Sequence, residues 1–156
     1  MSEKELIESF KTYLVKKGVS EDTIKIGQTK NPFMDIEFPI NGLYFCLEAK
    51  YSDDTERYQK KEKIDSNSRD SQNALSVFGS LLKGINLPIS NRGNGLPFKY
   101  GVLIAKSLKK QYKKHWNKIG LDNWNKFGEE FNIEFVFVAD LKNGKYMRKN
   151  WKNFLK

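Results

Sequence analysis

The sequence has one cysteine, Cys46, and one histidine, His115, among its 156 residues. A single cysteine excludes an intrachain disulfide framework and a cysteine-rich zinc site, and a single histidine excludes a histidine-rich metal site. No apolar run approaches the roughly 18 residues of a membrane span, and the N-terminus shows no signal-peptide pattern. These absences predict a cytoplasmic protein in a reducing compartment, with no membrane partner.

Acidic residues are scarce in the C-terminal part of the chain. Residues 1–97 carry 14 basic and 14 acidic side chains, whereas residues 98–156 carry 14 basic and 5 acidic ones, which accounts for the net charge of +9. This asymmetry is typical of a protein that binds a polyanion, and the alternative is a lysine-rich composition on solvated helix faces. Aromatic residues among the lysines favour nucleic acid: Tyr112, Trp116, Tyr146 and Trp151.

The hydrophobic pattern predicts an α/β fold with a mixed central sheet flanked by helices. We expect helices over 2–17, 68–83 and part of 108–130, strands over 23–26, 33–40, 43–51, 100–105 and 133–139, and a basic tail at the end. The order is αβββαβ plus a C-terminal αβ. The chain of 156 residues suits one domain, with a core at 1–84 and 100–106 and a basic extension over 107–156.

Asn41-Gly42 is the strongest short signal for a two-residue hairpin turn. Such a turn pairs residues whose numbers add to 83. One face of the hairpin is then apolar in every pair: Ile40 with Leu43, Phe38 with Phe45, Ile36 with Leu47 and Met34 with Ala49. The other face pairs Glu37 with Cys46 and Asp35 with Glu48, and Lys50 points to that side because side chains alternate along a strand.

Opposed side chains in a hairpin have Cβ atoms about 4.5–5.5 Å apart, where two ionised carboxylates repel unless a cation lies between them. Asp35 and Glu48 therefore suit Mg²⁺, which prefers oxygen ligands and meets phosphate oxygens. Lys50 can stabilise charge on a phosphate or orient the attacking water. The alternative is an ordinary cross-strand ion pair between Lys50 and an acid.

Asp35, followed by Glu48-Ala49-Lys50 on the next strand, resembles the PD-(D/E)xK nuclease motif, with Met34 where many members have proline. The resemblance implies a restriction-endonuclease-like core. Two further segments, Glu3-Lys4-Glu5-Leu6 and Arg69-Asp70, are similar to those of archaeal-type Holliday junction resolvases. The similarity covers about residues 2–84 and the strand at Tyr100, but not the loop over 88–97 or the segment over 108–130.

The resemblance implies that Asp35, Glu48 and the main-chain carbonyl of Ala49 bind Mg²⁺, with Mn²⁺ as a substitute, and that Lys50 acts on the water. It also implies a further acid from the first helix. Periodicity favours Glu3, which shares a face with the apolar residues of that helix. A capping box with Ser2 already explains Glu5, and Glu8 is a weaker candidate.

Further residues are expected around the site. Gln72 is a candidate to reach the active site, and the expected nucleic-acid contacts are Arg69, Lys106, Lys109, Lys110, Lys113 and Lys114. We expect a flexible turn over 91–95 in which Arg92 can touch a DNA backbone. His115 is expected on the surface, and Cys46 is expected to be a small packing residue.

The predicted activity is Mg²⁺-dependent hydrolysis of DNA phosphodiester bonds by an endonuclease. By resemblance, the enzyme is a homodimer that cuts branched DNA in recombination or repair, or in a mobile element. The alternatives are a small restriction-type endonuclease, a toxin-like ribonuclease, and a nucleic-acid-binding protein without catalytic activity.

Overall fold

The computed structural model describes residues 2–28, 32–51 and 66–156. The strands are β1 (Lys25–Ile26), β2 (Ile36–Ile40), β3 (Leu43–Lys50), β4 (Phe98–Ala105), β5 (Ile133–Asp140) and β6 (Lys145–Asn150). The helices are α1 (Glu3–Lys16), α3 (Ser66–Ile85), α4 (Lys106–Trp116) and α5 (Leu121–Phe131), with 3₁₀ turns at Glu21–Thr23 and Gly93–Gly95. The six strands form one mixed sheet in the order β1 to β6. The expected α/β class with a helix-flanked mixed sheet is therefore confirmed.

The β2–β3 hairpin has the predicted register, from Ile40 opposite Leu43 to Ile36 opposite Leu47. Asn41 and Gly42 both have positive φ angles, 51° and 78°, as the favoured two-residue hairpin turn requires. Pro39 is tolerated inside β2 because β1 pairs only with Ile36 and Glu37, so Pro39 lies beyond that neighbour.

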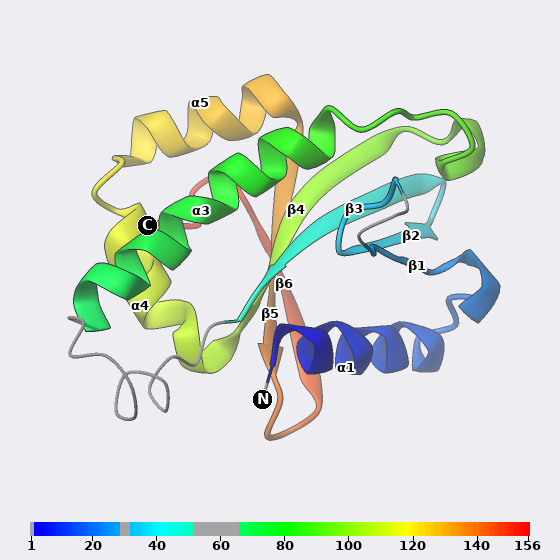
Figure 1. Ribbon diagram of the computed structural model, residues 1–156, viewed down its shortest axis with the longest axis horizontal. Helices are drawn as coiled ribbons and strands as arrows, with labels where there is room; N and C mark the ends of the chain where they lie inside the picture. The colour runs from blue at the N-terminus through cyan, green and yellow to red at the C-terminus, as the bar shows by residue number, and fades with distance from the viewer. Residues whose placement is uncertain (1, 29–31, 52–65) are drawn as a thin grey trace.

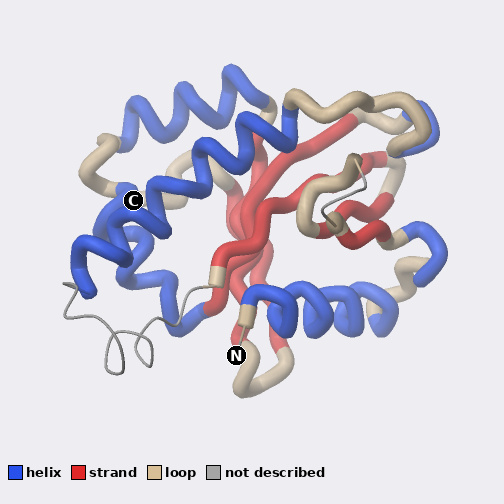
Figure 2. The backbone as a smooth tube through the Cα atoms, in the orientation of Figure 1, coloured by secondary structure: helices blue, strands red, loops and turns tan. Residues whose placement is uncertain are grey.

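Strand β4 lies between β3 and β5 and is parallel to both. The C-terminal ends of these three strands therefore lie at one edge of the sheet. Val102, Leu103 and Ile104 are fully buried, as the continuous apolar run predicted. Helix α1 covers one face of the sheet and α3, α4 and α5 cover the other, with the strands between them (Figures 1 and 2).

Each face of the sheet has its own hydrophobic core. Under α1, Leu6, Phe10 and Leu14 pack against Phe38 and Phe45. The core under α3, α4 and α5 contains three buried tryptophans. Together the two cores bury both faces of the sheet.

Met34 departs from the predicted alternation. It belongs to the core under α3 rather than to the α1 face, and it fits against Gly84, where a Cβ would lie 2.6 Å from Met34 Sδ. The expectation that Met34 faces Ala49 within a strand beginning at residue 33 is therefore wrong. β2 begins at Ile36, and the backbone changes direction just before it.

The end of the chain is not a basic tail, because residues 145–150 form the edge strand β6. Trp151 stacks on Trp124 with ring centroids 3.6 Å apart, and each indole N–H donates to the other residue's carbonyl oxygen. Tyr112, Trp116 and Trp151 are almost completely buried. These three aromatic residues fill the core, so their presence among the lysines is explained by packing and they offer no stacking surface to nucleic acid. Among the described residues, no helix has the length and apolar character needed to span a membrane.

Candidate active site

Asp35 lies just before β2 and is held by two hydrogen bonds, one from β3 and one from the residue that follows β1. The backbone N–H of Ala49 donates to Asp35 Oδ2 at 2.8 Å, and the N–H of Gly27 donates to the carbonyl oxygen of Asp35 at 3.1 Å. The paired register of β2 and β3 stops at Ile36 and Leu47, so the Asp35 carboxylate serves as an acceptor just past the end of the ladder. The bend therefore leaves Asp35 outside the ladder, and its carboxylate accepts a hydrogen bond from the backbone of β3 instead.

Glu48 and Lys50 lie near the C-terminal end of β3, two residues apart, so both point to the same side of the sheet. Burial raises the pKa of Glu48 well above its ordinary value, and the charge of Asp35 and a hydrogen bond with Asp35 raise it further. The predicted juxtaposition of the two carboxyl groups is therefore present. They share a site where ionisation of both is unfavourable without a cation.

Glu3 reaches this site from the first turn of α1. Ser2 caps the helix by accepting the N–H of Glu5 at 3.1 Å. Burial, followed by the charge of Asp35, raises the pKa of Glu3, while Lys50 and a backbone hydrogen bond from Tyr51 act in the opposite direction. Glu5 and Glu8 on the same helix are exposed. Of the three acids considered in this helix, Glu3 is the one beside Asp35.

A cavity of about 370 Å³ opens beside the two carboxylates. Its lining includes Asp35, Glu48, Met34 and, from the last turns of α3, Lys83 and Gly84. Lys83 carries no distinguishing signal in the sequence, because a lysine near a helix C-terminus is ordinarily explained by the helix dipole. Its position places an exposed cation in the lining of the same cavity as the acids.

The structure does not bring Gln72 into this cavity. Gln72 is exposed and lies 11 residues before Lys83, which is about 16 Å along a helix at 1.5 Å per residue. Among the described side chains of α3, those that line the cavity belong to its C-terminal end. Arg69 lies within α3, but its side chain is outside the described part of the chain.

The predicted lysines of α4 begin at the same sheet edge, because α4 directly follows β4. Lys106 pairs with Asp140 at 3.4 Å, and Lys113 lies over the ring of Phe154 at 5.5 Å. Lys109 also lies over that ring, and burial and the charges of Lys113, Lys149 and Lys106 lower its pKa. Lys110 and Lys114 are exposed. These residues form one cationic cluster. Lys149 of β6 also belongs to it, which the sequence did not indicate.

Arg92 and His115 were wrongly expected on the surface. Arg92 is buried in a two-pronged ion pair with Glu37, with Nη2–Oε2 2.5 Å and Nε–Oε1 3.0 Å. His115 is buried at the end of α4. Cys46 is fully buried, as expected of a packing residue, and burial raises the pKa of its thiol far above the ordinary value. None of these three groups can meet a large substrate.

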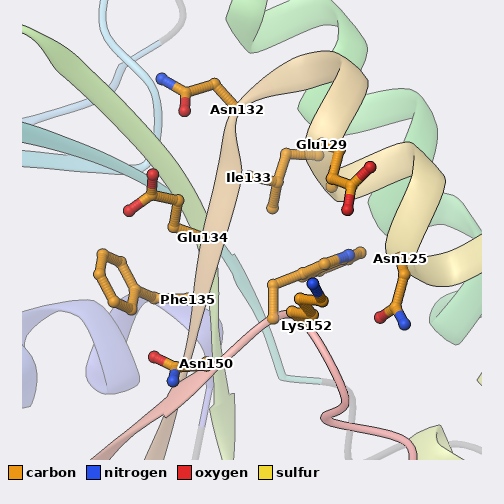
Figure 3. A pocket seen from close by; sticks show the side chains of 10 residues that line it. Asn125, Glu129, Asn132, Ile133, Glu134, Phe135, Asn150 and Lys152 are labelled. Atoms are coloured by element: carbon orange, nitrogen blue, oxygen red, sulfur yellow. The ribbon is translucent and has the colours of Figure 1, made fainter.

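A second hollow of about 280 Å³ lies at the opposite edge of the sheet, near the start of β5 and the end of β6 (Figure 3). Three of its polar residues already take part in the fold. Glu134 pairs with Lys99 at 2.6 Å, Asn132 donates to the carbonyl oxygen of Phe98 at 2.7 Å, and Asn125 accepts the N–H of Asn153. This hollow is therefore a weaker candidate than the Asp35–Glu48 site.

Within the described ranges, no group of three or more His, Cys, Asp or Glu side chains is arranged to hold a metal ion. The donors that the structure does bring together are the two carboxyl groups of Asp35 and Glu48, with Glu3 and the backbone of Ala49 beside them. Comparison of the chain with protein-family models, curated proteins and solved structures finds no match.

Proposed function

We propose that the protein is a Mg²⁺-dependent endonuclease that hydrolyses phosphodiester bonds in DNA, built on a restriction-endonuclease-like core. The observation that carries this proposal is the half-buried Asp35–Glu48 pair at the end of β3, with Glu3 and Lys50 beside it. The resemblance of Asp35 and Glu48-Ala49-Lys50 to the PD-(D/E)xK motif supports the same activity.

The donor set fits a hard divalent cation. Mg²⁺ keeps several waters and needs only one or two protein carboxylates together with substrate phosphates, so a third acidic ligand is not required. The raised pKa values of Glu48 and Glu3 reflect burial and crowded negative charge, which a cation would relieve. When bound, Mg²⁺ supplies a Lewis acid for the phosphate and lowers the pKa of a coordinated water.

Each residue of this chain then has a role. Asp35, Glu48 and the carbonyl oxygen of Ala49 hold the ion, and Glu3 adds negative charge from α1. Lys50 orients the attacking water or stabilises charge on the phosphate. Lys83 lines the same cavity as Asp35 and Glu48 and suits a phosphate group of the DNA.

The cationic cluster gives the DNA a second area of contact. Its members, Lys106, Lys109, Lys110, Lys113, Lys114 and Lys149, neutralise backbone phosphates without reading sequence, so affinity falls steeply with salt. By resemblance to the junction resolvases, the active form is a symmetric homodimer in which each copy cuts one strand.

The test incubates the purified protein with Mg²⁺ and with labelled four-way junctions, linear duplex, single strands and RNA. We expect cleavage of DNA that stops when the metal is chelated. Asp35→Asn should abolish cleavage and leave DNA binding intact, because only the metal ligand is lost. The control is Asp22→Asn, which changes an exposed acid and should cut like the wild type.

The products separate the remaining possibilities. Symmetric cuts in a junction support a resolvase-like enzyme, and a fixed fragment pattern on long duplex supports a restriction-type enzyme. Cleavage of RNA alone would replace DNA as the substrate. Binding of DNA without any cutting, unchanged in Lys50→Ala, would overturn the enzymatic proposal in favour of a nucleic-acid-binding protein.

A further inference from the structure

A second acidic group, Glu37, is buried two residues after Asp35 and is fully compensated. Its side chain accepts four hydrogen bonds. Oε2 receives the backbone N–H of Met34 at 2.6 Å and Nη2 of Arg92 at 2.5 Å, and Oε1 receives the hydroxyl of Tyr44 at 2.8 Å and Nε of Arg92 at 3.0 Å. A carboxylate with no exposed surface persists only with such partners.

The bond to Met34 spans the point where the chain bends. Met34 lies outside β2 and packs on the α3 side. Its N–H is fixed by the Glu37 carboxylate, and the next residue is Asp35, whose own carbonyl accepts from Gly27. The backbone on both sides of the Asp35 Cα is therefore held by named hydrogen bonds, one of which depends on Glu37.

Arg92 connects this bend to the segment between α3 and β4. Besides the ion pair, its Nη1 donates to the carbonyl oxygen of Pro88 at 3.1 Å, and its guanidinium lies over the ring of Phe98 at 5.2 Å. Leu87, one residue before Pro88, lines the cavity beside Asp35 and Glu48. One buried side chain thus contacts both the carboxylate that fixes the bend and the segment that forms the cavity wall.

We propose that the Glu37–Arg92 pair is a positioning unit that holds the Asp35 carboxylate in place beside Ala49 and Glu48. The side chains of Glu37 and Arg92 are 0% and 1% exposed, so neither can touch substrate. They act through the backbone of Met34 and Asp35. This inference rests on the proposed function for its kinetic consequence, and it also has a structural consequence in the metal-free protein.

The experiment compares Arg92→Met with Tyr44→Phe. Arg92→Met removes the guanidinium and one bond from each oxygen of Glu37, whereas Tyr44→Phe removes one bond from Oε1 and leaves both bonds at Oε2. Arg92→Lys retains the charge without the two-pronged geometry and should recover part of the loss. Circular dichroism and thermal melting establish the highest temperature at which every variant remains folded. All measurements are made below that temperature.

The first measurement needs neither metal nor activity. In the metal-free protein, the Ala49 amide donates to Asp35 Oδ2, so its hydrogen-exchange rate reports the position of that carboxylate. In Arg92→Met, exchange at Ala49 should quicken by about tenfold, because local opening becomes easier. Amides in the middle of β4 serve as the internal reference. In Tyr44→Phe, exchange at Ala49 should stay near the wild-type rate.

The second measurement uses cleavage kinetics with Mn²⁺ or Mg²⁺. A misplaced ligand should lower kcat by about 10²-fold with KM for DNA unchanged, and should raise the half-saturating metal concentration. Wild-type exchange at Ala49 in Arg92→Met, or equal effects of Arg92→Met and Tyr44→Phe, would overturn the positioning role. If Arg92→Met and Tyr44→Phe differ in exchange at Ala49 as expected but the wild-type protein cuts no nucleic acid, the proposed function alone is overturned.

Discussion

Two acidic centres lie on the same hairpin and differ in what surrounds them. Glu37 is fully buried and receives four hydrogen bonds, two of them from Arg92. Glu48, partly buried, has Asp35 as its main charged neighbour, and burial and that neighbour raise its pKa. The fold itself neutralises the first centre. The second carries crowded carboxylates that a bound cation would stabilise, which is the difference between a structural ion pair and a candidate binding site.

The largest expected effect comes from breaking the compensated centre. Glu37→Gln leaves one oxygen acceptor for four donors and leaves Arg92 buried without a counter-charge. We expect the free energy of unfolding to fall by about 3–5 kcal/mol, as it does when one partner of a buried ion pair is removed. Urea unfolding followed by circular dichroism measures it.

The matched control is Glu21→Gln, which removes the exposed partner of Lys11 from a surface pair at 3.5 Å. That change should cost at most about 1 kcal/mol. If Glu37→Gln cost no more than Glu21→Gln, the contrast between a structural and a binding centre would disappear.

The next effect concerns the cation. If Mg²⁺ binds the folded protein at Asp35 and Glu48, a concentration of 100 times its dissociation constant should raise the free energy of unfolding by about 2.7 kcal/mol. Thermal melting with Mg²⁺ and with chelator, at equal ionic strength, measures this gain. Asp35→Asn should lose it. An equal gain in Asp35→Asn would place the ion elsewhere.

Local signals explain why much of the fold could be predicted. Only a few neighbouring residues determine the hairpin register, namely Asn41-Gly42 and the alternating apolar residues on either side of the turn. The edge strand β6 has no such signal, because five of its six residues are exposed and its sequence is mostly charged or polar. The tertiary structure shows that this segment belongs to the sheet, because it pairs antiparallel with β5 from Lys145 opposite Asp140 to Asn150 opposite Phe135. Tyr146 also fixes it to α1, with its hydroxyl 2.6 Å from that of Ser9.

The residues of the candidate site also divide into those that local sequence patterns predict and those that depend on tertiary packing. Glu48 and Lys50 follow from alternation along β3, and Glu3 follows from helical periodicity. Asp35 lies near Glu48 as the hairpin register suggested, although it is just beyond the paired residues. Arg92 could not be predicted, because its partner Glu37 is 55 residues away in the sequence and its Gly- and Asn-rich surroundings are typical of an exposed turn. Lys83 was missed for a related reason, since its place in the lining of the same cavity as the acids depends on how α3 packs on the sheet.

The smallest expected effect is a substitution that raises the free energy of unfolding instead of lowering it. Because the pKa of Glu48 is raised above the ordinary 4.5, the metal-free folded protein keeps a proton that the unfolded chain releases, and its stability falls as pH rises above that value. Glu48→Gln cannot ionise, so it should flatten this slope. At pH 8 it should raise the free energy of unfolding by at least about 1.4 kcal/mol, the equivalent of a shift of one pKa unit.

Urea unfolding at pH 5.5 and pH 8 without metal measures the slope, with the exposed Glu8→Gln as control. The same Glu48→Gln protein should lose the gain from Mg²⁺ and the cleavage of DNA, because a metal ligand has become neutral. A group whose removal stabilises the protein while abolishing its activity is one that the fold retains for function. A wild-type slope in Glu48→Gln would show instead that the Asp35–Glu48 centre is as well compensated as Glu37.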